Sequence, residues 1–124
     1  MRNVCLIAAV VLAGSVSAVQ AADITGVLVD KACYLQDKAN TTNAHKGMGE
    51  TCAQACAKKG GTVALVTEKG EVYDVMTMGS LVGENNAKLV PHMSHTVTLT
   101  GDIVESPDKK TKTLHATALK MISK

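Results

Sequence analysis

Aromatic residues and arginine are almost absent from this sequence. It contains no Trp and no Phe, Tyr occurs twice, and the one arginine is Arg2. Protein surfaces that bind nucleic acids combine arginine with aromatic side chains on which bases stack. The composition therefore argues against nucleic-acid binding, and any hydrophobic core has to be made mainly of Val, Leu, Ile and Ala.

The common catalytic and cofactor motifs are also missing. The sequence has no Gly-x-Ser-x-Gly nucleophile motif and no phosphate loop, and it has no Cys-x-x-Cys or Cys-x-x-Cys-His motif of the thioredoxin or haem-attachment type. Asp30, Asp74 and Asp102 lie on or near predicted strands, and we interpret them as solvated strand ends. The sequence thus predicts no nucleotide and no haem, and it favours a protein that is not an enzyme.

The first residues have the features of a secretory signal peptide. Arg2 gives a positive start, residues 4–19 are almost wholly apolar, and Ala21 is a small residue of the kind that signal peptidase favours. We place the cleavage after Ala21, with Ala22 as the alternative, so that residues 1–21 are the signal peptide and residues 22–124 form a single domain. Because no second hydrophobic stretch follows, we expect no membrane span and a periplasmic or secreted protein.

Removal of the signal peptide leaves three cysteines, 12 lysines and 11 acidic residues, with a formal charge of about +1. This charge gives no strong attraction for a polyanion. Three cysteines in an oxidising compartment could form one disulfide with a spare thiol, hold a metal together, or bond to another molecule. A bond between two copies of the chain would make a homodimer.

Alternation of apolar residues predicts five strands. They fall at residues 24–31, 62–67, 71–77, 96–103 and 113–122. Gly26 indicates a bend or a close backbone approach in the first strand, and Lys69-Gly70 indicates the tight turn of a hairpin. Residues 79–94 have apolar residues at mixed spacing between chain breakers, which predicts a short helix between loops.

All three cysteines lie between the first and second predicted strands. Residues 34–49 are polar and have no sustained period, so we expect a long surface loop there. Residues 50–59 are good helix formers, and Gly60-Gly61 after them is a stop signal. Cys52 and Cys56 are four residues apart and would share one face of this helix.

The order of these elements predicts a mainly β fold. Five strands with a short helix between strands 3 and 4 is the order of the OB fold, a small five-stranded barrel. A narrow barrel interior also suits a core of small side chains. The departure from this pattern is the cysteine-bearing helical insertion of about thirty residues between strands 1 and 2.

Four residues of the insertion could hold one metal ion: Cys33, His45, Cys52 and Cys56. Thiolates and imidazole form tetrahedral zinc sites, and thiolates also suit cuprous copper. A disulfide from Cys33 to Cys52 or Cys56 is an alternative, and it would stabilise the domain by about 3 kcal/mol. A redox role is another, because Cys52 lies near a helix N-terminus, which lowers the pKa of a thiol.

The motif pattern of the chain resembles that of a known group. Its parts are Val29-Asp30, Cys33-Tyr34, His45, Cys52-x3-Cys56, Gly60, Ala64-Leu65-Val66, Gly70, Val72-Tyr73, Leu89 and Val97-Thr98-Leu99-Thr100-Gly101. In this pattern the chain is similar to small exported bacterial proteins of uncharacterised function, which are similar in turn to periplasmic bacterial OB-fold proteins. The resemblance spans almost all of residues 22–124 and implies a periplasmic OB-like barrel with no established reaction.

We therefore predict a periplasmic, non-enzymatic OB-like domain that binds zinc or copper through Cys33, His45, Cys52 and Cys56. One alternative is a thiol-redox protein that uses Cys52 or Cys56. The other is a disulfide-stapled interaction module that binds an envelope component on its barrel face. The three hypotheses assign different chemical states to the same cysteines.

Overall fold

The computed structural model describes residues 21–36, 38 and 52–123. His45 and the side chain of Cys52 lie outside the described residues, and so does the predicted signal peptide apart from Ala21. Among the helices that are described, none has the length and apolar character needed to cross a bilayer.

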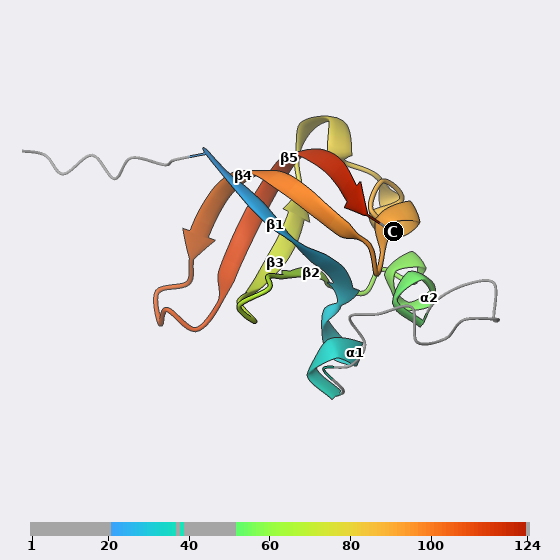
Figure 1. The fold of residues 1–124 in the computed structure, drawn as a ribbon, viewed down its shortest axis with the longest axis horizontal. Coiled ribbons are helices and arrows are strands. Elements are labelled where there is room, and N and C mark those ends of the chain that lie inside the picture. Colours follow the sequence, from blue (N-terminus) through green and yellow to red (C-terminus); the bar gives the residue numbers. More distant parts are fainter. Residues whose placement is uncertain (1–20, 37, 39–51, 124) are drawn as a thin grey trace, which may run out of the picture.

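Five strands form one mixed sheet that closes into a ring (Figure 1). They are β1 (Ala21–Asp30), β2 (Val63–Val66), β3 (Val72–Thr77), β4 (Thr96–Glu105) and β5 (Lys112–Ser123). The order around the ring is β1-β2-β3-β5-β4, and β4 pairs back onto β1. β3 and β5 run parallel, and the other neighbouring pairs are antiparallel. The prediction of a mainly β fold with five strands is confirmed.

Short helices occupy the two longer connections. α1 (Lys31–Gln36) and α2 (Cys52–Lys58) lie between β1 and β2. The loop was predicted to start at Tyr34, but residues 34–36 are the last part of α1. Between β3 and β4 the chain forms three 3₁₀ helices, η1 (Gly79–Leu81), η2 (Glu84–Asn86) and η3 (Val90–His92), where one short helix was expected.

Gly26 allows β1 to pair with two different neighbours. The first part of β1 pairs with β4 and the last part with β2, and the two pairings overlap at Val27. A Cβ atom at Gly26 would collide with the backbone carbonyl of Val66 on β2. The close backbone approach predicted at this glycine is confirmed, and it lies where β1 passes from one partner to the other.

The interior of the ring is filled by aliphatic side chains. Val97 and Leu99 alternate with half-buried threonines along β4 and are fully buried, as are Leu28, Leu65 and Leu114 of the other strands. Burial of each such side chain contributes about 1.5–3 kcal/mol. The core therefore reaches full burial without Phe or Trp.

A second apolar cluster lies on the outer face of β1 and β2. Val29, Ala64 and Val66 are buried there against Tyr34 of α1. As a result, every residue of β2 is buried, on both faces of the sheet. The Tyr34 ring holds α1 against the sheet, beside the residue that carries the first thiol.

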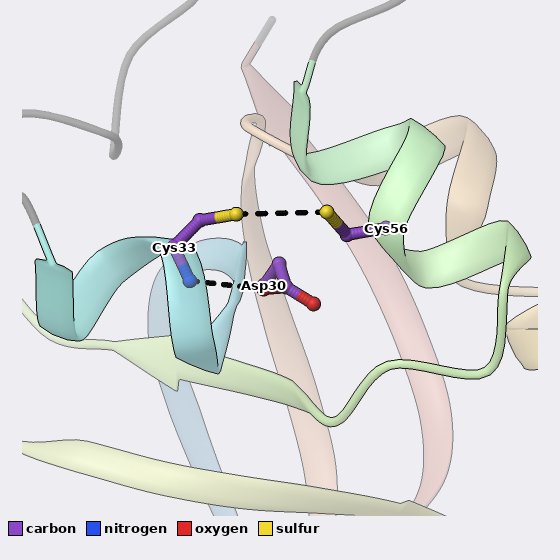
Figure 2. Close-up of side chains that lie close together, drawn as sticks. All are labelled: Asp30, Cys33 and Cys56. Carbon is purple, nitrogen blue, oxygen red and sulfur yellow. Dashed lines mark hydrogen bonds between the residues drawn. The ribbon is translucent and has the colours of Figure 1, made fainter.

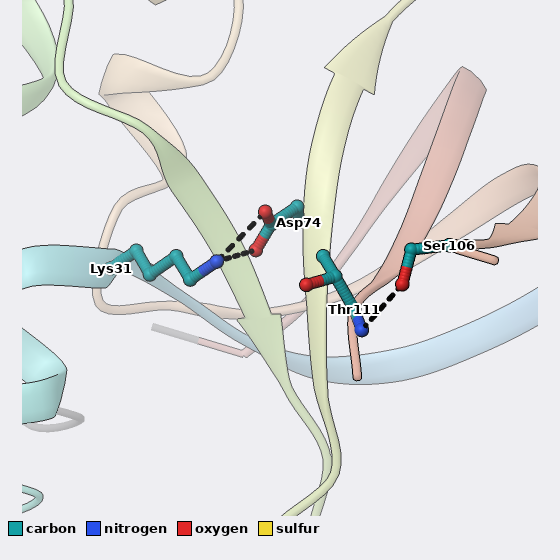
Figure 3. Close-up of polar contacts among 4 residues, drawn as sticks. All are labelled: Lys31, Asp74, Ser106 and Thr111. Carbon is teal, nitrogen blue, oxygen red and sulfur yellow. Dashed lines mark hydrogen bonds and ion pairs between the residues drawn. The ribbon is translucent and has the colours of Figure 1, made fainter. Parts of the chain in front are cut away.

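Polar contacts fasten the start of α1 to the neighbouring hairpin (Figure 3). The Lys31 ammonium lies 2.8 Å from the Asp74 carboxylate oxygens on β3, and the Lys31 N–H donates to the Thr62 carbonyl at 2.9 Å. The end of β1 is thus tied to β3 as well as to β2.

A second polar contact in Figure 3 lies in the β4–β5 connection, where the Thr111 N–H donates to Ser106 Oγ at 3.1 Å.

We expect Gly26→Ala to lower the free energy of unfolding by about 2 kcal/mol or more, because the added methyl group meets strand backbone that has little room to move. Gly83→Ala is the matched control, since the nearest atom to a Cβ there is the exposed Ala87 side chain, at 3.3 Å. Urea denaturation of the two variants measures the difference. Equal losses would contradict the role assigned to Gly26.

Candidate metal centre

Asp30 ends β1 and caps the first turn of α1. Its Oδ1 atom accepts a hydrogen bond of 3.0 Å from the Cys33 N–H, which is the bond that an N-cap residue makes to the third helical residue. Asp30 is only 3% exposed. The interpretation of Asp30 as a solvated strand end is wrong, because the carboxylate turns inward to cap the helix.

The cap brings Cys33 close to the carboxylate. Side chains on an α-helix tilt toward its N-terminus, and Cys33 is the third residue of α1. The Cys33 side chain therefore leans back toward the turn that Asp30 caps. Its thiol is half-buried.

Cys56 is positioned by the way α2 ends. Gly60 has a φ of +85°, and its N–H donates to the Ala57 carbonyl at 3.0 Å. The N–H of Gly61 donates to the Cys56 carbonyl at 3.1 Å. These two bonds define a Schellman motif, which confirms the stop signal predicted at Gly60-Gly61.

A glycine is required at position 61 because a side chain would not fit there, and not because of its backbone conformation. A Cβ atom at this position would lie 2.5 Å from Asp30 Oδ2 and 2.9 Å from the Cys56 carbonyl oxygen. The absence of a side chain lets the Asp30 carboxylate approach the C-terminal end of α2. Backbone carbonyls make that end of a helix favourable for a cation and unfavourable for an unpaired anion.

Two side-chain amides connect α2 to the segment between β3 and β4. Asn86 Nδ2 donates to the carbonyls of Ala57 and Gly61, both at 2.9 Å. Gln54 Nε2 donates to the Val90 carbonyl at 3.3 Å. The segment between β3 and β4 thereby positions the helix that carries Cys56.

Two sulfurs and a carboxylate converge between the helices. Cys33 Sγ and Cys56 Sγ are 3.6 Å apart, and one oxygen of Asp30 lies within 4.8 Å of both. Figure 2 shows the sulfurs pointing toward one another from α1 and α2, with Asp30 beside them. The three residues form a group that could hold a metal ion.

The sulfur separation fits two thiolates that share one ion. Zinc–sulfur bonds of about 2.3 Å at a tetrahedral angle place two sulfurs about 3.8 Å apart. A disulfide requires roughly 2.05 Å. The spacing of Cys33 and Cys56 is close to that of two sulfurs on one zinc ion, and it is also the distance of the hydrogen bond between the two thiols.

Asp30 has a cation as its sequence neighbour, but the Lys31 ammonium forms its ion pair with Asp74. The described part of the chain contains no ion pair to Asp30, and its carboxylate accepts the hydrogen bond from the Cys33 N–H. A cation bound beside the carboxylate would offset part of the cost of burying it.

The structure brings together two of the four residues predicted as ligands, Cys33 and Cys56. Cys52 is the first residue of α2, but its side chain, like the whole of His45, lies outside the described residues. Asp30 is the member of the group that the sequence analysis missed. An available signal was the spacing Asp30-x-x-Cys33 at a strand end, which is the spacing of an N-cap and the residue it caps.

Comparison with known proteins adds no family to this description. No protein-family model matches the chain, and no curated protein or solved structure shows significant similarity to it. The case for the site therefore depends on its own geometry.

We expect Asp30→Ala to lower the free energy of unfolding by about 1–2 kcal/mol in the presence of a chelator, because the α1 cap is lost. Asp30→Asn should cost less than about 0.5 kcal/mol, since an amide oxygen can accept the same hydrogen bond. Denaturant unfolding of both variants measures the two effects. A loss as large in Asp30→Asn would assign the stabilisation to the charge instead of the cap.

Proposed function

We propose that this protein is a periplasmic, non-enzymatic OB-like domain that binds zinc through Asp30, Cys33 and Cys56. The observation that carries the proposal is the convergence of two sulfurs, 3.6 Å apart, and a buried carboxylate on one point. The strand order around the ring and the helical segment between β3 and β4 support the OB-like description. The resemblance to small exported bacterial proteins and the predicted signal peptide support the location.

Asp30 favours zinc over cuprous copper among the two metals considered. Zinc accepts sulfur, nitrogen and carboxylate oxygen in a tetrahedral site. Cuprous copper is selected by soft thiolate and thioether ligands, and a carboxylate contributes little to its binding. A site that includes Asp30 therefore suits zinc better than a site of three thiols would.

Cys52 and His45 are our candidates for completing the coordination. Structural zinc sites usually have four protein ligands, and the group described above supplies three. Cys52 precedes Cys56 by one helical turn, so the two residues belong to the same face of α2. His45 belongs to the segment that connects α1 to α2.

A bound ion would join the two helices at the ends of this connecting segment. Because zinc binds the folded arrangement of ligands and not the unfolded chain, its binding free energy adds to the stability of the domain. The two cysteines are half-buried rather than enclosed. A site of this kind suits an ion that stabilises the insertion and can still be exchanged with solvent.

Zinc affinity, measured by competition with a chromophoric chelator, tests the site. We expect Cys33→Ser and Cys56→Ser each to weaken zinc binding by about 100-fold or more, because a hydroxyl is a poor substitute for a thiolate. Asp30→Asn should weaken zinc binding but leave cuprous ion binding nearly unchanged. The matched control is Ala55→Ser, which adds a hydroxyl to the same helix and removes no ligand.

The metal site is refuted if the two cysteine variants keep the affinity of the wild-type chain. The protein must stay reduced in every titration, because oxidation of the thiols would also abolish zinc binding and would hide the effect of the substitutions. Thiol counting before each titration verifies this condition.

The fourth ligand can be identified with cobalt(II) in place of zinc. We expect one of Cys52→Ser and His45→Ala to weaken binding by about tenfold to 100-fold and to alter the visible spectrum of the cobalt ion. Loss of a thiolate reduces the sulfur-to-metal charge-transfer band, whereas loss of the imidazole leaves that band intact. If both variants behave as wild type, neither residue is a ligand.

A further inference from the structure

We propose that Cys33 and Cys56 also form a reversible disulfide, and that its formation releases the bound metal. The release rests on the metal site proposed above, but formation of the disulfide can be measured without any metal. The site would then respond to the supply of small disulfides as well as to the supply of zinc.

The first argument is the position of the two sulfurs. They lie 3.6 Å apart and point toward one another from separate helices. Shortening this separation by about 1.5 Å gives the length of a disulfide bond. Both residues are half-buried, so a small disulfide can reach them.

The second argument is the shared use of the two sulfurs. The thiols that would hold the ion are the same two that face one another. A metal needs both sulfurs as thiolate ligands, and a disulfide needs both sulfurs as bonding partners. The same pair of side chains therefore allows a metal-bound state or an oxidised state.

The exchange proceeds in two steps with a small disulfide, RSSR, as the oxidant. One thiolate of the pair attacks a sulfur of RSSR, forms a mixed disulfide and expels RS⁻. The other thiolate attacks the protein sulfur of that mixed disulfide, forms the Cys33–Cys56 bond and expels a second RS⁻. The protein loses two electrons, the small disulfide gains them, and the two RS⁻ ions take up protons from solvent.

Metal binding and the disulfide exclude one another because both use the same electron pairs. A thiolate is the metal ligand, and a disulfide sulfur is a poor one. Oxidation of zinc-loaded protein would leave Asp30 as the one member of the group still able to bind. The ion then leaves as aqueous Zn²⁺, and the charge balances against the two RS⁻ ions produced.

The experiment treats the reduced chain with glutathione disulfide, first metal-free and then loaded with zinc. Intact mass reports the loss of two hydrogens, and a zinc-responsive dye reports free ion. Cys52 and Cys56 share the tryptic peptide between Lys46 and Lys58, so a Cys52→Ser variant is run in parallel to assign the linkage. Reduced glutathione at the same concentration controls for zinc binding by the small thiol.

We expect a Cys33–Cys56 linkage in the Cys52→Ser variant and, in the wild-type chain, release of about one zinc ion for each disulfide formed. Reduction with dithiothreitol should restore zinc binding. Absence of the linkage, or a linkage formed while zinc stays bound, overturns the inference and leaves the metal site standing. A reduced wild-type chain that binds no zinc overturns the metal site itself, and this result is read before any oxidant is added.

Discussion

The hydrogen bond from the Cys33 N–H to the Asp30 carboxylate is the contact on which the site depends. It ends β1, starts α1 and keeps an acidic side chain in a place that is only 3% exposed. The same bond places the Cys33 thiol beside the carboxylate. The local fold therefore brings a carboxylate oxygen and two sulfurs into a group that could hold a metal ion.

The closed sheet provides the frame in which two short helices can face each other. β1 is held on both edges, by β4 and by β2, and it delivers Asp30 to a defined position. Tyr34 secures α1 on the outer face of the sheet, and Asn86 secures the end of α2. These contacts bring residues 23 positions apart in sequence to within hydrogen-bonding distance of each other.

The proposed site is chemically suited to two states because two of its three members are cysteines. Carboxylate and thiolate together attract a divalent ion, while the thiolates alone can lose two electrons and become neutral. In the two states proposed above, both the ion and the oxidant come from outside the chain. The state of the site would then depend on its surroundings.

Local patterns in the sequence determined most of the secondary structure. Alternation of apolar residues located the strands, Gly70 marked the hairpin turn and Gly60-Gly61 marked the end of α2, since each depends on neighbouring residues alone. The sequence also placed Cys33 and Cys56 among the candidate ligands. Only the tertiary structure decided that Asp30 is buried and lies beside the two half-buried cysteines, because burial and convergence depend on contacts between residues far apart in the chain.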